Sequence, residues 1–150
     1  MIRVPHPVDM KTVRPVERSK FNIRDNSYVF LFLFDMMSYF ERKNPLGLIE
    51  AFKLAFKSDE DVCLVLKTSN SAANPEAQRK IKEAIKGCQV TLIDSILSRE
   101  DINSLINISD CYVSLHRSEG FGLPLAEAMY LGKPVIATAY SGNMDFMTLT

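Results

Sequence analysis

Two glutamates flank a short glycine-rich loop. In the segment SEGFGLPLAEAM, Glu119 and Glu127 are separated by seven residues, and Gly120 and Gly122 lie between them. Glycine has no side chain, so the backbone of this loop can approach a ligand closely. A carboxylate on each side of bare backbone indicates a ligand site, although a glutamate on a helix is more often simply solvated.

The chemistry of this loop favours a phosphate accompanied by hydroxyl groups. The loop runs into an expected helix near Leu123, where free N–H groups and the helix dipole attract anions. Lys43, at another expected junction of strand and helix, would add a positive charge. A carboxylate about 7 Å from a phosphate, at an effective dielectric of about 20, raises the free energy by roughly 2 kcal/mol. Because a charge-assisted hydrogen bond from a hydroxyl returns roughly 1.5–3 kcal/mol, the glutamates fit a nucleotide sugar.

Five apolar strands alternate with helices along the chain. Apolar runs predict strands over residues 28–34, 61–67, 89–94, 111–115 and 135–139. The expected capping residues Asn44, Asn74 and Ser98, together with prolines and glycines, predict helices over residues 45–56, 74–87, from 98 onward, and 123–131. This alternation predicts an α/β fold, a Rossmann-like, doubly wound parallel sheet in a single domain. Such sheets bind ligands at the carboxyl ends of their strands, where the glycine-rich loop is expected.

The two ends of the chain differ from its middle. Residues 1–27 carry three prolines, many charges and no sustained period, so we interpret them as an inter-domain linker before a domain over residues 28–150. The chain stops just after a strand, where another helix would begin. We therefore expect an excised domain that is truncated at its C-terminus.

Composition excludes several classes of partner. The chain has 18 Lys and Arg against 18 Asp and Glu, so no net field would recruit nucleic acid or a membrane. Its longest apolar run is far shorter than the roughly 20 residues that span a bilayer, and no signal peptide opens the chain. Cys63, Cys88 and Cys111 are expected as small core residues in a reducing compartment. We expect a cytoplasmic protein, with peripheral membrane association of the full-length protein left open.

The motifs match a known family. Both common nucleotide-binding fingerprints, G-x-G-x-x-G after the first strand and G-x-x-x-x-G-K-[ST], are absent. Instead, SEGFGLPLAEAMYLGKPVIATAYSGNMDFM closely resembles the donor-binding signature of the family-4 retaining glycosyltransferases. FLFDMMSYFERKNPLGLIEAF resembles the first strand, loop and helix of the same domain, and VPHPVD resembles the segment that leads into it. The resemblance covers roughly residues 2–147 and implies the C-terminal, donor-binding half of a GT-B fold.

The resemblance carries roles onto individual residues. It implies that Glu119 binds hydroxyls of the transferred sugar, that Glu127 binds the ribose, and that Lys43 neutralises the departing diphosphate. Glu119 and Lys43 would thus be the catalytic residues. It further implies that the backbone of one loop faces the sugar and diphosphate; its residues are Gly120, Phe121, Gly122 and Leu123. A second loop would border the nucleobase, and its residues are Asp94, Ser95, Ile96 and Leu97.

One position departs from the family pattern. Many members carry an arginine five residues before the lysine, where this chain has Ser38. Arg42, next to Lys43, is a candidate to replace this cation in the donor site, depending on the direction of its side chain.

Other residues have structural explanations that compete with functional ones. His116 is expected to be a satisfied polar residue beneath the loop, with a hydrogen bond to the sugar as the alternative. Asn143 and Asp145 follow the fifth strand and could approach the donor. Residues of the loop after the first strand are expected to pack rather than to stack on a ligand; they are Met36, Met37, Tyr39 and Phe40.

The resemblance implies an enzyme that acts in polysaccharide biosynthesis. It would transfer a hexose from a nucleotide-diphosphate sugar to a glycan or lipid-linked glycan with retained configuration, using no metal and no cofactor. Its partners would be the donor and an N-terminal acceptor domain, without which this fragment should transfer little sugar. The alternatives are a GT-B sugar-nucleotide epimerase or phosphorylase, and a non-catalytic interaction module. The base, the sugar and the acceptor are not fixed by the sequence.

Overall fold

Five parallel strands form one sheet. The computed structural model describes residues 7–8, 10 and 13–148. The strands run in the order β3-β2-β1-β4-β5. Their bounds are Tyr28–Asp35 (β1), Val62–Ser69 (β2), Val90–Asp94 (β3), Cys111–Ser114 (β4) and Val135–Ala137 (β5). All five lie where the apolar runs predict them.

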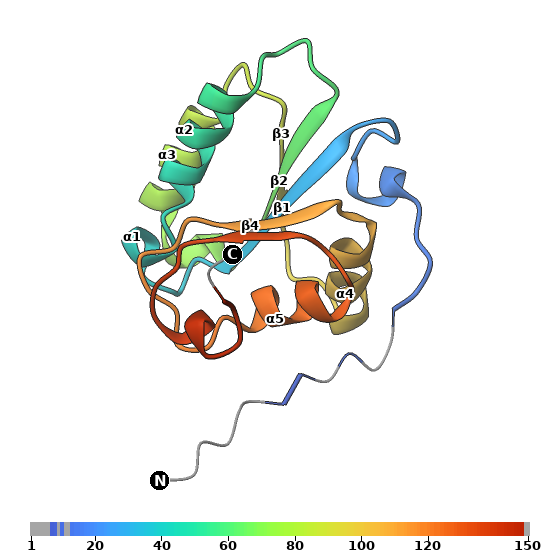
Figure 1. The fold of residues 1–150 in the computed structure, drawn as a ribbon. Coiled ribbons are helices and arrows are strands. Elements are labelled where there is room, and N and C mark those ends of the chain that lie inside the picture. Colours follow the sequence, from blue (N-terminus) through green and yellow to red (C-terminus); the bar gives the residue numbers. More distant parts are fainter. Residues whose placement is uncertain (1–6, 9, 11–12, 149–150) are drawn as a thin grey trace, which may run out of the picture.

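Helices cover both faces of this sheet, which confirms the predicted doubly wound fold. Figure 1 shows α2 and α3 on one face and α4 and α5 on the other. The helices are α1 (Phe40–Lys43), α2 (Pro45–Ala55), α3 (Pro75–Ala84), α4 (Arg99–Ile108) and α5 (Leu123–Tyr130). Short 3-10 turns span Arg18–Phe21, Ser71–Ala73 and Gly142–Asp145. The single turn α1 lies where we expected only a loop, and α3 ends three residues before the predicted terminus.

The core lies along the two central strands. Val29 and Leu31 of β1 and Leu64 and Leu66 of β2 are fully buried, because helices cover each face. Fully burying a side chain of this kind stabilises the fold by about 1.5–3 kcal/mol. This double coverage explains why the strands carry continuous apolar runs rather than alternating patterns.

Two of the three predicted helix caps are present. The side chains of Asn74 and Ser98 accept hydrogen bonds from the third helical N–H of α3 and α4, at 3.0 and 3.1 Å. Asn44 precedes α2 but does not cap it with its side chain. Its φ is 53°, and its Nδ2 donates to the carbonyl oxygen of Leu115 at 2.9 Å. The residue therefore ties the start of α2 to the end of β4, so the prediction of a cap was wrong.

The segment before β1 packs on the domain from Arg14 onward, where the backbone N–H and carbonyl oxygen of Arg14 are hydrogen-bonded to the hydroxyl of Ser104. The guanidinium of Arg18 donates to the carbonyl oxygens of Ile108 and Ser27 and to the carboxylate of Asp110 (2.7 Å). Phe21 and Ile23 are buried in the core. The role of residues 1–27 as an inter-domain linker stays a prediction, and residues 4–6 and 9 of VPHPVD lie outside the described part of the chain.

All three cysteines are free thiols. Cys63 and Cys111 are buried in strands, as expected, whereas Cys88 is only half-buried in the loop before β3. The expectation of a core position was therefore wrong for Cys88. Among the described residues, no helix combines the length and apolar character that crossing a bilayer requires.

Candidate functional site

The candidate site lies at the carboxyl edge of β1 and β4. The chain builds β1, β2 and β3 outward on one side and then returns to place β4 and β5 on the other. Such a switch point opens a crevice between the loops of the two diverging strands, where doubly wound sheets bind ligands. The loop after β1 carries Lys43 and the loop after β4 carries Glu119, so residues 76 positions apart meet here.

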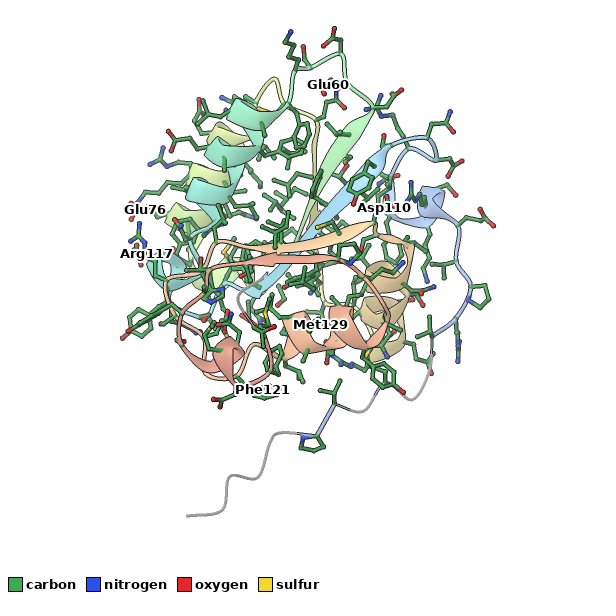
Figure 2. All side chains as sticks on the ribbon, in the orientation of Figure 1. Glu60, Glu76, Asp110, Arg117, Phe121 and Met129 are labelled. Carbon is green, nitrogen blue, oxygen red and sulfur yellow. The ribbon has the colours of Figure 1, made fainter. Side chains whose placement is uncertain are left out.

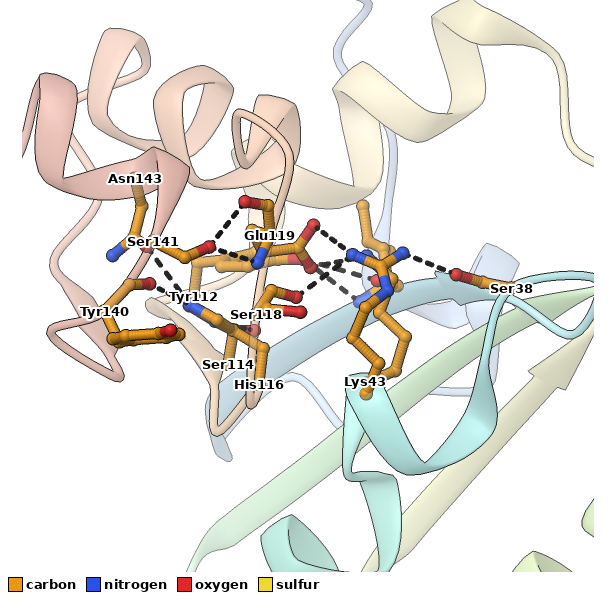
Figure 3. A network of polar contacts seen from close by, with 12 residues as sticks. Ser38, Lys43, Tyr112, Ser114, His116, Ser118, Glu119, Tyr140, Ser141 and Asn143 are labelled. Atoms are coloured by element: carbon orange, nitrogen blue, oxygen red, sulfur yellow. Dashed lines mark hydrogen bonds and ion pairs between the residues drawn. The ribbon is translucent and has the colours of Figure 1, made fainter.

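Glu119 is held from two sides (Figure 3). Its carboxylate accepts a hydrogen bond from Nζ of Lys43 through Oε1 and lies 3.4 Å from a guanidinium nitrogen of Arg42 through Oε2. Its backbone is fixed by Ser141, whose Oγ accepts from the N–H of Glu119 at 2.7 Å and donates to its carbonyl oxygen at 2.5 Å. Glu119 and Lys43, the two residues that the resemblance implies to be catalytic, are thus in direct contact.

Arg42 points into the same site. Its guanidinium donates to Ser38 Oγ at 2.7 Å and to the carbonyl oxygen of Ser118 at 3.0 Å. Arg117 lies beside α1 (Figure 2), and its backbone N–H donates to the carbonyl oxygen of Arg42 at 2.8 Å. The direction that the sequence left open is therefore toward Ser38 and Glu119. Two cations and one carboxylate share this edge of the sheet.

The glycine-rich loop leads directly into α5. Gly122 has φ of 87°, a left-handed conformation that favours glycine, and forms the N-terminal cap of the helix. Its carbonyl oxygen accepts from the N–H groups of Leu125 and Ala126 at 3.0 and 3.1 Å. Pro124 has no N–H, and the N–H of Leu123 has no acceptor in the described part of the chain. One backbone donor is thus available at the positive end of the helix dipole.

A second glycine supports the loop from below. A Cβ on Gly142 would lie 1.9 Å from the carbonyl oxygen of Gly120, so the two backbones are in direct contact. The N–H of Gly142 also donates to the carbonyl oxygen of Glu119 at 3.0 Å. A Cβ on Gly120 itself would meet nothing within 4 Å in the described structure. The loop is therefore packed on one side and open on the other.

The aromatic residue of the loop packs rather than reaches outward. The ring of Phe121 lies 4.9 Å from that of Phe146, centroid to centroid. This contact fastens the loop to the segment after β5, which also carries Ser141 and Gly142.

Glu127 occupies a different environment from Glu119. It lies on α5, its side chain is only 2% exposed, and its Oε1 accepts from the guanidinium of Arg99, the first residue of α4. Its Oε2 is buried and has no hydrogen-bond partner in the described part of the chain. Burial raises the pKa of Glu127, and the hydrogen bond and charge of Arg99 act in the opposite direction.

Sequence reasoning missed Arg99. A signal was available, because a cation in the first turn of a helix is disfavoured by the helix dipole unless a carboxylate lies nearby.

The two glutamates face the same buried tyrosine. Burial raises the pKa of Tyr112, and the negative charges of Glu119 and Glu127 raise it further. The hydroxyl of Tyr112 accepts from the backbone N–H of Leu33 at 3.3 Å, within the sheet. Both carboxylates therefore lie close enough to Tyr112 to act on it electrostatically.

The loop that we expected beside the nucleobase is fixed at its first residue on the α3 side. The carboxylate of Asp94 accepts from Ser71 and Gln78 on the α3 side, at 2.6 Å each. Although burial acts to raise the pKa of Asp94, these hydrogen bonds and one from Thr68 lower it below its ordinary value. The other residues of the loop differ in exposure: Ser95 and Ile96 are exposed and Leu97 is half-buried.

His116 belongs to the scaffold beneath the loop. It is 1% exposed, and its ring nitrogens lie 3.0 Å from Ser114 Oγ and 3.1 Å from Asn143 Oδ1. Asn143 is also buried and donates to the carbonyl oxygen of Thr138 at 3.0 Å. Both side chains are occupied in joining β4 to the segment after β5, as Figure 3 shows.

The loop after β1 packs only in part. Met36 and Phe40 are buried, as expected, but Met37 and Tyr39 are 74% and 80% exposed. The expectation of packing was therefore wrong for these two. The carboxylate of Asp35 fixes the loop by accepting a hydrogen bond from the N–H of Met37 at 2.8 Å. In this loop conformation the side chains of Met37 and Tyr39 turn outward.

No group of three or more His, Cys, Asp and Glu side chains within residues 7–8, 10 and 13–148 is arranged to hold a metal ion. The positive charge at the edge comes from side chains and from a helix terminus.

Comparisons with known proteins agree on one family. The family model described as "Glycosyl transferases group 1" matches residues 13–149. A trehalose synthase from Rubrobacter xylanophilus is 25% identical over 117 residues, which are 74% of this chain and 28% of that protein. The chain thus spans just over a quarter of the length of this curated relative.

Solved structures share the fold. Anabaena HepE in complex with UDP-glucose superposes with a TM-score of 0.71 at 23% identity, covering 88% of this chain and 35% of that one. The C-terminal domain of LpcC, a glycosyl transferase group 1 family protein from Francisella tularensis, gives a TM-score of 0.66 at 23% identity over 93% of this chain and 72% of that one. These similarities confirm the predicted fold, one Rossmann-like half of GT-B.

Proposed function

Because this chain belongs to the glycosyl transferases group 1 family, we propose that it is the part of a glycosyltransferase that binds the nucleotide-sugar donor. The observation that carries the proposal is Glu119, held between Lys43 and Arg42 beside an open glycine loop at the start of α5. HepE, a protein of the same fold, was solved with UDP-glucose.

The diphosphate would lie between the two cations and the loop. Lys43 and Arg42 supply two positive charges against the one carboxylate that they contact here, and the free N–H of Leu123 adds a donor. A diphosphate that enters would draw both cations from Glu119 toward itself. The carboxylate would then accept hydrogen bonds from sugar hydroxyls, which it can do while still ionised.

The same arrangement suits the chemical step. When the bond between the anomeric carbon and the diphosphate oxygen breaks, the electron pair stays on the oxygen and negative charge grows there. Lys43 and Arg42 would stabilise this charge without the rearrangement that solvent would need. Arg42 thereby supplies the cation that Ser38 cannot. Retention of the anomeric configuration and independence from metal follow from the family resemblance and belong to the proposal.

The whole reaction would need more protein than this chain contains. The chain spans 28% of its curated relative, and GT-B enzymes react between two domains. We propose that an acceptor-binding domain of the same protein provides the second substrate, a glycan or a lipid-linked glycan. The chain alone would then bind the donor and transfer little sugar.

Calorimetric titration with UDP, GDP and ADP tests the proposal. At least one should bind saturably, and Lys43→Met should weaken it about tenfold or more, since a charge-assisted contact of 1.5–3 kcal/mol is lost. Lys80→Met is the matched control, because Lys80 pairs with Glu76 on the exposed surface of α3. No binding of any diphosphate, or equal losses in both variants, would contradict the proposal.

A further inference from the structure

Arg99 and Glu127 form an ion pair between α4 and α5. The side chain of Glu127 is 2% exposed and that of Arg99 is 52% exposed, so the pair runs from the interior to the surface. The guanidinium contacts only one carboxylate oxygen. The other oxygen is buried and lacks a hydrogen-bond partner in the described residues. A buried ionised oxygen without a partner is unfavourable, so an unfilled acceptor at this position calls for an explanation.

Few groups could compensate the charge of Glu127. Arg99 faces it from α4, and the neutral hydroxyl of Tyr112 faces it from β4. Glu119, which also acts on Tyr112, already pairs with Lys43 and Arg42. Burial raises the pKa of Glu127, and among the described residues Arg99 is the group that lowers it. Arg99 thus favours the ionised form of this carboxylate against the effect of burial.

We propose that Arg99 is a positioning residue for nucleotide binding, which holds Glu127 as an ionised acceptor and leaves Oε2 for the vicinal ribose hydroxyls. The inference rests on the proposed function, because it assigns the ribose to Glu127. It adds a residue outside the glycine-rich motif, on the helix that follows β3.

The geometry allows Arg99 and a ribose to share the carboxylate. An ionised carboxylate has about four acceptor positions, and Arg99 uses one on Oε1. Oε2 of Glu127 is inaccessible in this structure, so a ribose can reach it only if the groups around it move. Arg99 has room to move, since it is half-exposed and its other described contact is a 3.8 Å approach to Met10 Sδ. Its side chain can swing aside while one N–H remains on Oε1.

The test removes the charge and the ribose hydroxyls separately. Arg99→Met keeps the length of the side chain without its charge, and Arg99→Lys restores a charge. Arg14→Met is the matched control, because Arg14 pairs with Glu100, one position further along α4, on the exposed surface. Each variant is titrated at pH 7 with whichever of UDP, GDP and ADP binds the wild type, and with the 2′,3′-dideoxy form of that nucleotide. Thermal unfolding verifies that each variant is folded.

Arg99→Met should weaken the ribonucleotide about tenfold and change the affinity of the dideoxy form less than twofold. Arg99→Lys should recover most of the loss, and Arg14→Met should match the wild type. Equal losses for both nucleotides would show a merely structural role, and an increase in affinity would show that Arg99 competes with the ribose. Either result overturns the proposal.

A second measurement needs no ligand. The carboxyl 13C resonance of Glu127, followed against pH, should give a higher pKa in Arg99→Met than in the wild type. An unchanged pKa would refute the role of Arg99 even if nucleotides bind. If no diphosphate binds the wild type, the proposed function and the ribose assignment fail together, whereas an unchanged pKa with intact binding removes only the role of Arg99.

Discussion

Substituting alanine for Gly142 should displace the glycine-rich loop. The added Cβ would lie 1.9 Å from the carbonyl oxygen of Gly120 and 2.9 Å from that of Glu119, and real Cβ contacts essentially never fall below 3.0 Å. The first atom must therefore retreat by at least 3.0 − 1.9 = 1.1 Å. Neither obstacle is a flexible side chain, because both are backbone atoms of the loop itself.

The expected loss of stability follows from this overlap. Overpacking of this kind typically costs about 1–3 kcal/mol. For a chain of this size, each kcal/mol lowers the melting temperature by about 2–4 °C. The displacement also weakens the hydrogen bond from the N–H of Gly142 to Glu119 and misaligns the carboxylate with Lys43. We therefore expect the affinity for a nucleoside diphosphate to fall about tenfold as well.

Gly120→Ala is the matched comparison. A Cβ there meets nothing within 4 Å in the described structure, so urea denaturation should show stability within about 0.5 kcal/mol of the wild type. Its methyl group would project into the space proposed for the donor, so it should weaken the nucleotide without weakening the fold. The reasoning is refuted if Gly142→Ala unfolds at the wild-type urea concentration, or if the two variants lose equal stability.

Three further substitutions probe buried polar groups. Burial raises the pKa of Glu127 in the folded state above its ordinary 4.5, so the stability of the wild type relative to Glu127→Gln should be greatest at low pH and decline as pH rises through the folded pKa. Urea denaturation of both proteins from pH 4 to 8 measures this difference, and a difference that does not change with pH would contradict the prediction. Lys67 is 7% exposed, and burial lowers its pKa because a charged ammonium is unfavourable away from water. Lys67→Met should therefore raise the free energy of unfolding at pH 7 by about 1 kcal/mol, and a clear loss of stability would refute this prediction. His116→Ala should lower the free energy of unfolding by about 2–4 kcal/mol, because it opens a cavity and leaves Asn143 without one partner. Arg117→Ala, at the exposed next position, should stay within about 0.5 kcal/mol of the wild type, and similar losses in both variants would contradict the scaffold role of His116.

The features that sequence predicted correctly are those that local chemistry determines. Strands β1 and β2 lie beneath helices on both faces, so their continuous apolar runs identify them directly. Asn74 and Ser98 cap helices because a short side chain beside a helix start can reach the third N–H. That Lys43 and Glu119 lie at the same edge of the sheet follows from the rule that strand ends converge there, whereas their direct contact was not predicted and depends on β4 lying next to β1.

The features that sequence missed depend on tertiary contacts. Asn44 has the residue type of a cap, but the end of β4 competes for its amide group. Arg99 meets Glu127 across 28 residues, and only the rotation of α5 about its own axis determines which side of that helix faces α4. Met37 and Tyr39 are apolar but exposed, because Asp35 and the turn that follows it fix the loop geometry before packing can turn them inward.

A nucleoside diphosphate should bind against the glycine-rich loop at the start of α5. Backbone amide resonances in 1H–15N spectra, followed during titration with UDP, GDP and ADP, test this binding most directly. We predict saturable shifts for the amides of Gly120, Gly122 and Leu123, together with that of Lys43 at the end of α1. Shifts confined to the opposite edge of the sheet, around Gly87, or no saturable shift with any of the three diphosphates, would contradict it.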